Sequence, residues 1–271
     1  MRVLVTGANP GGIGGEICRK LARDADAKGL RAKIVAATTG TRPGDADEII
    51  SDLRALGADA LSVTGDLADP SVPARLVAEA VAFCGGLDAL VANAGLRRQG
   101  PLLDLSVEDW DAIFAVNTRA TWLLARAAHP ALKQAAAEGT GGSIVAITSI
   151  AADYPQINYG AYTPSKAAEA SLVQLLATEW AGDGIRVNAI APGIIRTRHA
   201  AAVYANAEFA RARNAIVPLG RIGQPADIAG VVASLLSPDC AYVTGQHITV
   251  DGGFAATVMA RVPGRPPAAH S

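Results

Sequence analysis

The sequence predicts an α/β protein with one domain, built around a doubly wound parallel sheet of about seven strands with helices on both faces. Short apolar runs rich in valine and isoleucine alternate with longer helical patterns along most of the chain. Several runs are apolar at successive positions, which is typical of parallel strands buried on both faces. A glycine-rich turn follows the first run directly, where a strand-to-helix connection is expected.

Seven strands are expected, at Arg2–Val5, Lys33–Thr38, Ala60–Thr64, Ala89–Ala92, Ser143–Thr148, Arg186–Ala191 and His247–Val250. Helical patterns lie between them, at Gly12–Asp26, Asp45–Leu56, Val72–Phe83, Val107–Ala137, Tyr159–Ala181 and Ala226–Leu236. Sustained alternation of this kind indicates βαβ units with right-handed crossovers.

The expected domain covers residues 1–254, and an irregular tail follows at residues 255–271, which contain a run rich in proline and glycine. Residues 196–218 follow a strand without leading promptly into another. A long excursion at the carboxyl end of a strand is a candidate lid over the ligand crevice, and His199 within it could then touch the substrate. An ordinary surface helix is the alternative for this segment.

The composition fits a compact soluble protein and argues against several function classes. Hydrophobic residues make up 50% of the 271 residues, charged residues make up 18%, and the net charge is −1 without a block of like charges. Nucleic acid is therefore not an expected partner. The three cysteines are scattered and no cluster has metal-ligand spacing, so we expect no disulfide and no metal. With no signal peptide and no apolar run of ~20 residues, we expect a cytoplasmic protein without a membrane span.

The turn after the first strand has the chemistry of a phosphate-binding loop. Glycines let the backbone turn sharply and let a pyrophosphate approach the start of the next helix, where unpaired N–H groups favour anions. Because this turn joins the first strand to the first helix, it predicts a dinucleotide site. The residues that would form it are Gly7, Asn9, Gly11, Gly12, Ile13 and Gly14.

The end of the second strand favours NADP(H), while NAD(H) stays possible. An acidic residue there would bind the ribose 2′-hydroxyl of NAD. The sequence instead has Thr39 and Arg42 and no carboxylate before Asp45. Arg42 could bind a 2′-phosphate through charge-assisted hydrogen bonds. The alternative is that Arg42 is a solvated loop charge.

Ser149, Tyr162 and Lys166 have the spacing of an acid/base site. Tyr162 and Lys166 are four residues apart, so on a helix their side chains share one face. A nearby cation favours the phenolate form of a tyrosine, which brings proton exchange closer to neutral pH. Ser149 follows an apolar strand, and its hydroxyl could hydrogen-bond a substrate oxygen at the sheet edge. Together these residues could transfer a proton to a carbonyl or from an alcohol.

These features resemble the short-chain dehydrogenase/reductase family, and the resemblance covers residues 1–254. It is carried by the Tyr162–Lys166 motif with Ser149 thirteen residues upstream, and by Asn93-Ala94-Gly95 after the fourth strand. The resemblance implies a Rossmann fold and a fourth catalytic residue, Asn117, which holds a water that links the lysine to a proton relay. It further implies cofactor contacts to the adenine, the adenosine-side pocket and the nicotinamide from Asp66, Leu67, Asn93, Ala94, Gly95, Pro192, Gly193, Ile195 and Thr197.

The glycine loop departs from the family pattern. The family commonly has three residues between its first two glycines and one between the last two. From Gly7, this chain offers either Gly11 and Gly14, or Gly12 and Gly14 with one residue inserted. Which glycine meets which phosphate therefore stays open.

The implied activity is hydride transfer between a nicotinamide and a carbon that bears oxygen. Tyr162 would donate the proton during reduction, Ser149 would bind the same oxygen, and Lys166 would bind the nicotinamide ribose. The substrate would be a small carbonyl compound or alcohol, with ketone or 3-oxoacyl reduction as the first expectation and an acyl thioester as one form. Sugar, polyol and steroid dehydrogenases share the same framework. The family resemblance also implies a homotetramer or homodimer.

Two alternatives stay open. Tyr159 is seven residues before Lys166, the separation found in related enoyl reductases, and on one continuous helix it would share the face of Tyr162. A non-catalytic NADP-binding regulator is the second alternative, although a mere binder needs no acid/base group. Arg97 and Arg98 could contact an anionic substrate or could be a solvated loop pair.

Overall fold

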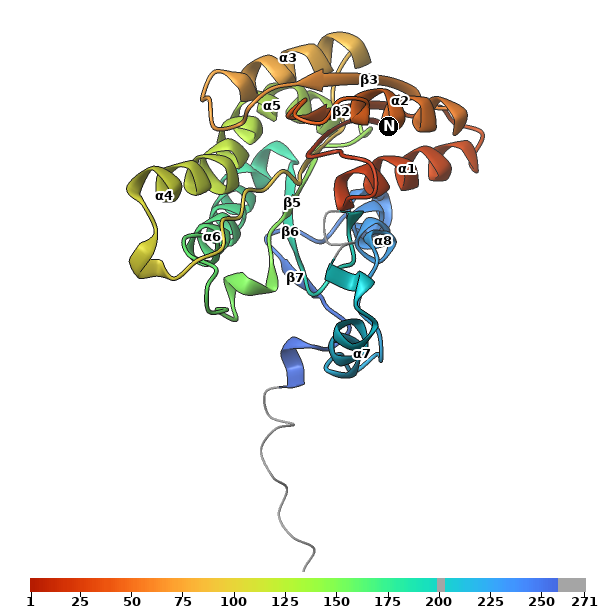
Figure 1. Ribbon diagram of the computed structural model, residues 1–271. Helices are drawn as coiled ribbons and strands as arrows, with labels where there is room; N and C mark the ends of the chain where they lie inside the picture. Colours follow the sequence, from red (N-terminus) through yellow and green to blue (C-terminus); the bar gives the residue numbers. More distant parts are fainter. Residues whose placement is uncertain (199–202, 258–271) are drawn as a thin grey trace, which may run out of the picture.

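Seven parallel strands form the centre of the computed structural model, which describes residues 1–198 and 203–257 (Figure 1). The strands are β1 Arg2–Thr6, β2 Lys33–Thr38, β3 Asp59–Thr64, β4 Ala89–Ala92, β5 Ser143–Ile147, β6 Arg186–Pro192 and β7 His247–Val250. All seven expected strands are confirmed, with boundaries that differ from expectation by one residue at most.

The order of the strands in the sheet is β3-β2-β1-β4-β5-β6-β7. The chain moves outward from β1 to β3 and then returns to β4 on the other side of β1, so its direction reverses between β1 and β4. All pairings are parallel, which brings the carboxyl ends of the strands to one edge of the sheet. In such sheets the crevice at the reversal point takes the ligand. Here that crevice opens where β1 ends at Thr6 and β4 ends at Ala92.

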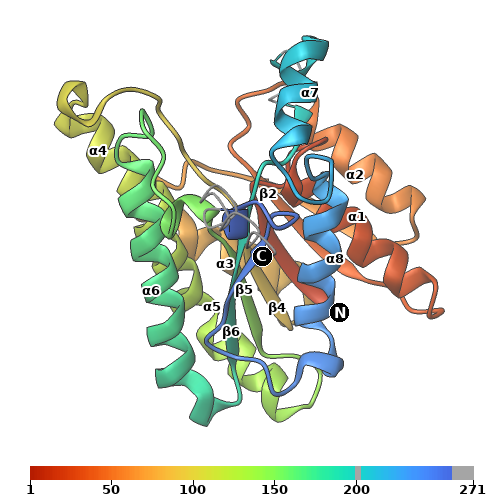
Figure 2. The ribbon, with the colours of Figure 1, turned by 90° about the horizontal axis from the view of Figure 1, so that it is seen from below.

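Helices cover both faces of the sheet (Figure 2). Their bounds are α1 Ile13–Asp26, α2 Asp45–Ala55, α3 Val72–Cys84, α4 Val107–Phe114, α5 Ala120–Ala137, α6 Tyr162–Trp180, α7 Ala207–Ala215 and α8 Pro225–Leu236. Buried side chains of α3, α5 and α6 form one core, and those of α1, α2 and α8 form the other. Successive strand residues alternate between them, as Leu90 and Val91 of β4 do. Each fully buried residue of this kind contributes roughly 1.5–3 kcal/mol.

The long helix expected at Val107–Ala137 is interrupted. Helix α4 ends at Phe114, a π-helical turn occupies Ala115–Arg119, and α5 begins at Ala120. A π turn holds one more residue than an α turn, and such turns are frequent at functional sites. The apolar pattern continues through the turn, so the sequence alone did not reveal it.

The expectation that a helix starts at Tyr159 is wrong, because α6 begins at Tyr162. Asn158 and Gly160 have φ angles of 64° and 50°, in the left-handed region. A right-handed helix cannot contain that backbone, so Tyr159 lies in the turn that precedes α6. The predicted common helical face of Tyr159 and Tyr162 therefore does not exist.

The segment expected to form a lid, residues 196–218, contains a 3₁₀ turn at Val203–Ala205 and helix α7. His199 lies outside the described residues, as do residues 258–271 of the expected tail.

Candidate active site

The glycine-rich turn between β1 and α1 has the backbone of an anion site. Gly7 and Gly11 have φ angles of 63° and 69°, which residues with a Cβ rarely adopt. Helix α1 begins after Gly12, and no side chain caps its N-terminus. The first N–H groups of α1 are therefore available to a phosphate.

Gly14 is tightly packed against the glycine loop. A Cβ built on Gly14 would overlap the carbonyl oxygen of Gly7 and would lie 2.5 Å from Asn93 Nδ2. Gly14 therefore lets α1 pack directly against the loop, and it does not line the cavity. Gly11 does not line the cavity either, because the side chain of Arg198 lies against it.

Asn93 joins the loop to the end of β4. Its Nδ2 donates hydrogen bonds to the carbonyl oxygens of Thr6, at 2.9 Å, and Gly7, at 3.0 Å. The hydroxyl oxygen of Thr6 accepts from the backbone N–H groups of Asn93 and Ala94, at 3.0 and 3.1 Å. These bonds fix the two strands on either side of the reversal point.

A cavity of about 1230 Å³ runs from the glycine loop to the start of α6. It exceeds the roughly 300–1,000 Å³ of a typical small-ligand pocket, which fits a dinucleotide together with a substrate. Ser149 lines it, together with these expected cofactor residues: Gly7, Asn9, Gly12, Ile13, Thr39, Asp66, Leu67, Asn93, Ala94, Gly95, Tyr162, Lys166, Pro192, Gly193, Ile195 and Thr197. Arg42 does not line it and is exposed on the loop before α2.

Tyr162 and Ser149 stand on one wall of this cavity. Tyr162 is the first residue of α6, and Ser149 lies two residues beyond the end of β5. The Ser149 hydroxyl oxygen accepts a hydrogen bond from the backbone N–H of Ala151 at 3.1 Å. Its own proton can therefore be donated into the cavity, which suits a group that binds a substrate oxygen.

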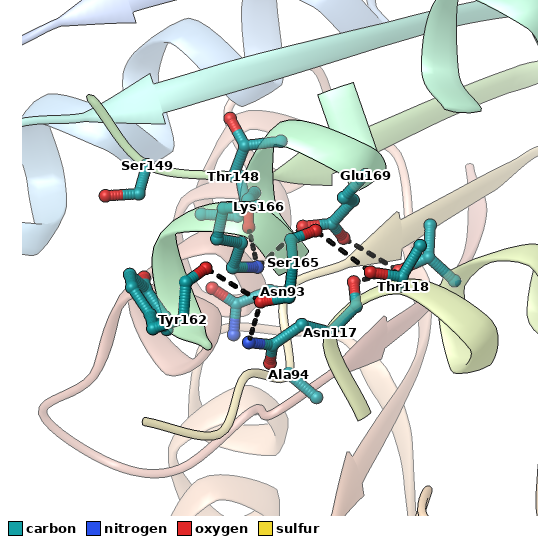
Figure 3. A network of polar contacts seen from close by, with 12 residues as sticks. Asn93, Ala94, Asn117, Thr118, Thr148, Ser149, Tyr162, Ser165, Lys166 and Glu169 are labelled. Carbon is teal, nitrogen blue, oxygen red and sulfur yellow. Dashed lines mark hydrogen bonds and ion pairs between the residues drawn. The ribbon is translucent and has the colours of Figure 1, made fainter. Parts of the chain in front are cut away.

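Lys166 is the largest of the fully buried side chains. Its Nζ donates to the carbonyl oxygen of Ile147 at 2.8 Å and to Glu169 Oε2 at 2.6 Å (Figure 3). Burial raises the pKa of the Glu169 carboxyl, and the Lys166 ammonium opposes that rise. Sequence reasoning missed Glu169, although a carboxylate three residues from a catalytic lysine, on the apolar stripe of a helix, is a signal that could have found it.

Asn117 lies behind the cavity wall in the π-helical turn and is fully buried. Its amide oxygen accepts from the backbone N–H of Leu96 at 2.7 Å, and its Nδ2 donates to Leu96 O and to Ser165 Oγ, both at 2.9 Å. The side chain therefore holds the loop after β4 against α6. The predicted water relay through Asn117 stays a prediction.

Four further residues line the cavity. Tyr159 and Arg97 were left as alternatives by the sequence analysis, whereas Tyr204 and Arg213 received no individual role there. Arg97 Nη1 donates to Tyr159 Oη at 3.3 Å, and Arg213 Nη1 donates to Tyr204 Oη at 3.4 Å. Residues from the segment expected to form a lid thus reach the cavity.

Comparison with known proteins decides the family. A protein-family model described as Enoyl-(Acyl carrier protein) reductase matches residues 7–255. Dehydrogenase/reductase SDR family member 4 of Bos taurus is 37% identical over 93% of this chain and 86% of its own length. The chain belongs to the short-chain dehydrogenase/reductase family.

Relatives within this family act on sugars and bind nicotinamide cofactors. An L-rhamnose 1-dehydrogenase (NAD(P)(+)) of Sphingomonas is 38% identical over 93% of this chain and 95% of its own length. A crystal structure of a candidate 2-deoxy-D-gluconate 3-dehydrogenase from Agrobacterium tumefaciens, with bound NADP, has a TM-score of 0.80. It is 36% identical and covers 94% of this chain and 96% of its own.

Residues 1–198 and 203–257 contain neither a metal-binding cluster nor a membrane-spanning helix. No group of three or more histidine, cysteine, aspartate or glutamate side chains is arranged to hold a metal ion. None of the described helices is long and apolar enough to cross a membrane.

We expect Gly14→Ala to lower both stability and dinucleotide affinity, because the new Cβ must displace Gly7 and Asn93. Overpacking of this kind costs about 1–3 kcal/mol. Gly230→Ala is the matched control, because a Cβ there meets open space in the middle of α8 and should stabilise by about 0.5–1 kcal/mol. Thermal unfolding and NADP(H) titration check both. Equal effects of the two substitutions would contradict the packing role of Gly14.

Proposed function

We propose that the protein is an NADP(H)-preferring oxidoreductase that interconverts a carbonyl compound and a secondary alcohol. One observation carries this proposal: Ser149, Tyr162 and Lys166 line the same cavity as the glycine loop. A proton-transfer group and a dinucleotide site in one cavity are what such a reaction needs. The bound NADP of the Agrobacterium neighbour supports the choice of cofactor class.

The nicotinamide cofactor, when bound, supplies or accepts the hydride. In reduction, the Tyr162 hydroxyl gives its proton to the substrate oxygen while Ser149 donates a hydrogen bond to that oxygen. In oxidation the same two groups act in reverse, with Tyr162 taking the proton. Lys166, at the cavity wall, stabilises the phenolate form of Tyr162. A positioned acid/base group contributes roughly 10²–10⁴-fold to the rate.

We further propose that the substrate carries an anionic group, such as the carboxylate of a sugar acid. Arg98 is paired with Asp109 at 2.8 Å. Arg97, Arg98 and Arg213 all line the cavity, but Arg97 and Arg213 have no carboxylate partner among residues 1–198 and 203–257. Arg97 stacks on the Tyr159 ring at 5.1 Å, and that ring packs edge-on against Tyr162 at 5.8 Å. A small substrate could thus reach both the guanidinium and the phenol. The gluconate-type name of the Agrobacterium neighbour supports this class.

An enoyl reductase is the second candidate. The description of the matching family model favours it, and Tyr159 lines the cavity close to Tyr162. A reductase of this kind would saturate a carbon–carbon double bond, with Tyr159 rather than Tyr162 in the central role.

We expect Tyr162→Phe to lower kcat by at least ~10²-fold while NADP(H) binding stays within about threefold, because only the acid/base hydroxyl is lost. Tyr159→Phe is the matched control and should retain most carbonyl reduction. Turnover is measured with sugar acids, simple ketones, a 3-oxoacyl thioester and an enoyl thioester. The opposite ranking of the two variants, with enoyl turnover, would establish the second candidate. Tight NADP(H) binding without any turnover would support a non-catalytic regulator.

We expect Arg97→Gln to raise KM for a carboxylated substrate about tenfold or more, because a charge-assisted hydrogen bond contributes about 1.5–3 kcal/mol. KM for an uncharged ketone should not change. Arg126→Gln is the control, since Arg126 is exposed on α5 and stacks on Trp122. Equal effects of Arg97→Gln on charged and uncharged substrates would contradict the anionic class.

We expect Arg42→Ala to lower kcat/KM with NADP(H) about tenfold and to leave kcat/KM with NAD(H) unchanged, because only NADP carries the 2′-phosphate. Arg54→Ala, on the exposed side of α2, is the control. If Arg42→Ala changes neither value, Arg42 is a solvated loop charge and Thr39 becomes the remaining predicted contact.

A further inference from the structure

The ion pair between Lys166 and Glu169 lies entirely inside the protein. Its Nζ–Oε2 distance is 2.6 Å, and the two side chains are 2% and 0% exposed. The second carboxylate oxygen of Glu169 accepts a hydrogen bond from Thr121 Oγ1 of α5 at 2.7 Å. Both carboxylate oxygens therefore have a donor.

Glu169 lies on the buried face of α6, and the buried residues that follow it are apolar. The buried stripe of this helix continues with Val173, Leu176 and Ala177, which pack in the core beneath the sheet. A carboxylate on such a stripe loses its hydration, a cost that an apolar side chain would avoid. Stability alone does not explain a glutamate here, so a role toward Lys166 is the better explanation.

The contacts of Lys166 fix the direction of its remaining proton. A lysine ammonium has three N–H donors. One donates to Ile147 O and one to Glu169 Oε2. Because Lys166 lines the cavity, its third N–H is left for a group inside that cavity. Without Glu169, the Lys166 ammonium would lose one of these two acceptors and keep the Ile147 carbonyl.

We propose that Glu169 is a positioning residue that holds the Lys166 ammonium and sets the pH at which Tyr162 exchanges its proton. The inference rests on the proposed roles of Tyr162 and Lys166. When Glu169 is ionised, the pair with Lys166 has no net charge, so it stabilises the Tyr162 phenolate less than a lone ammonium would.

The other charged groups near α6 do not replace Glu169 in this role. On the elements packed against α6, Arg119 donates to Ala68 O, Arg186 donates to Val243 O and Leu235 O, and Asp109 pairs with Arg98. Asp183 pairs with His129 and Lys133. The remaining charged residues of α4, α5 and α6 are exposed to solvent; they are Glu108, Asp111, Arg126 and Glu179.

Glu169→Gln tests the charge, because glutamine has the same shape and can keep hydrogen bonds to Lys166 and Thr121. Phenolate absorbance is recorded against pH for the unaltered protein and for the Glu169→Gln variant. The same curve for a Tyr162→Phe background is subtracted, which removes the other four of the five tyrosines. We expect the Tyr162 midpoint to fall by about one pH unit in Glu169→Gln. Coincident midpoints would overturn the proposal.

Glu169→Leu tests the positioning. It removes the hydrogen bond to Lys166, so we expect NADP(H) affinity to fall about tenfold and kcat to fall by a similar factor, whereas Glu169→Gln keeps both within about threefold. Unchanged binding and kcat in Glu169→Leu would overturn the positioning role. Asp88→Asn is the control, since Asp88 is buried at the opposite edge of the sheet beside Arg2 and should move neither readout.

The two proposals fail in different ways. If the proposed function is wrong, the unaltered protein shows no turnover, while the absorbance titration still reports the effect of Glu169 on Tyr162. If the proposed role of Glu169 is wrong, turnover is normal and the titration of Tyr162 does not respond to Glu169→Gln.

Discussion

A lysine ammonium held inside the protein is the constraint on which the whole site depends. An unpaired ammonium at the depth of Lys166 would cost several kcal/mol, so the fold must provide partners. It does so from two elements, with the carbonyl of Ile147 at the end of β5 and the carboxylate of Glu169 on α6. The hydrogen bond from Lys166 to Ile147 clamps α6 to the carboxyl edge of the sheet. The same clamp places Tyr162 and Ser149 on one wall of the cavity.

The second half of the site depends on the reversal of strand order. The loop after β1 and the loop after β4 meet only because β4 pairs with β1. Asn93 and Thr6 then cross-link the two loops, and Gly14 allows α1 to pack onto the first of them. Asn117 connects the loop after β4 to α6 through Leu96 and Ser165. The glycine loop and the acid/base residues are therefore parts of one hydrogen-bonded frame.

Much of this arrangement follows from the sequence, since strand and helix periods differ and parallel strands bring their carboxyl ends together. What the sequence did not reveal depends on single backbone conformations or on contacts between distant elements. The left-handed backbone conformation at Asn158 keeps Tyr159 outside α6, and the apolar pattern of the sequence does not predict that conformation. The close contacts of Gly11 with Arg198, and of Gly14 with Gly7 and Asn93, join distant segments that the sequence does not bring together. Phosphate binding by these two glycines stays a prediction. The burial of Glu169 depends on the packing of α6 against α5, whose Thr121 also hydrogen-bonds the carboxylate. The predicted homotetramer or homodimer and the lid stay predictions.

The central claim is that the Tyr162 hydroxyl and a bound nicotinamide share one reaction site, and a crystal structure with NADP(H) tests it most directly. The account predicts the pyrophosphate at the start of α1 and the nicotinamide ring beside the Tyr162 hydroxyl, with the ribose within hydrogen-bond reach of Lys166. A dinucleotide bound elsewhere, or a nicotinamide ring turned away from Tyr162 in every copy, would contradict it.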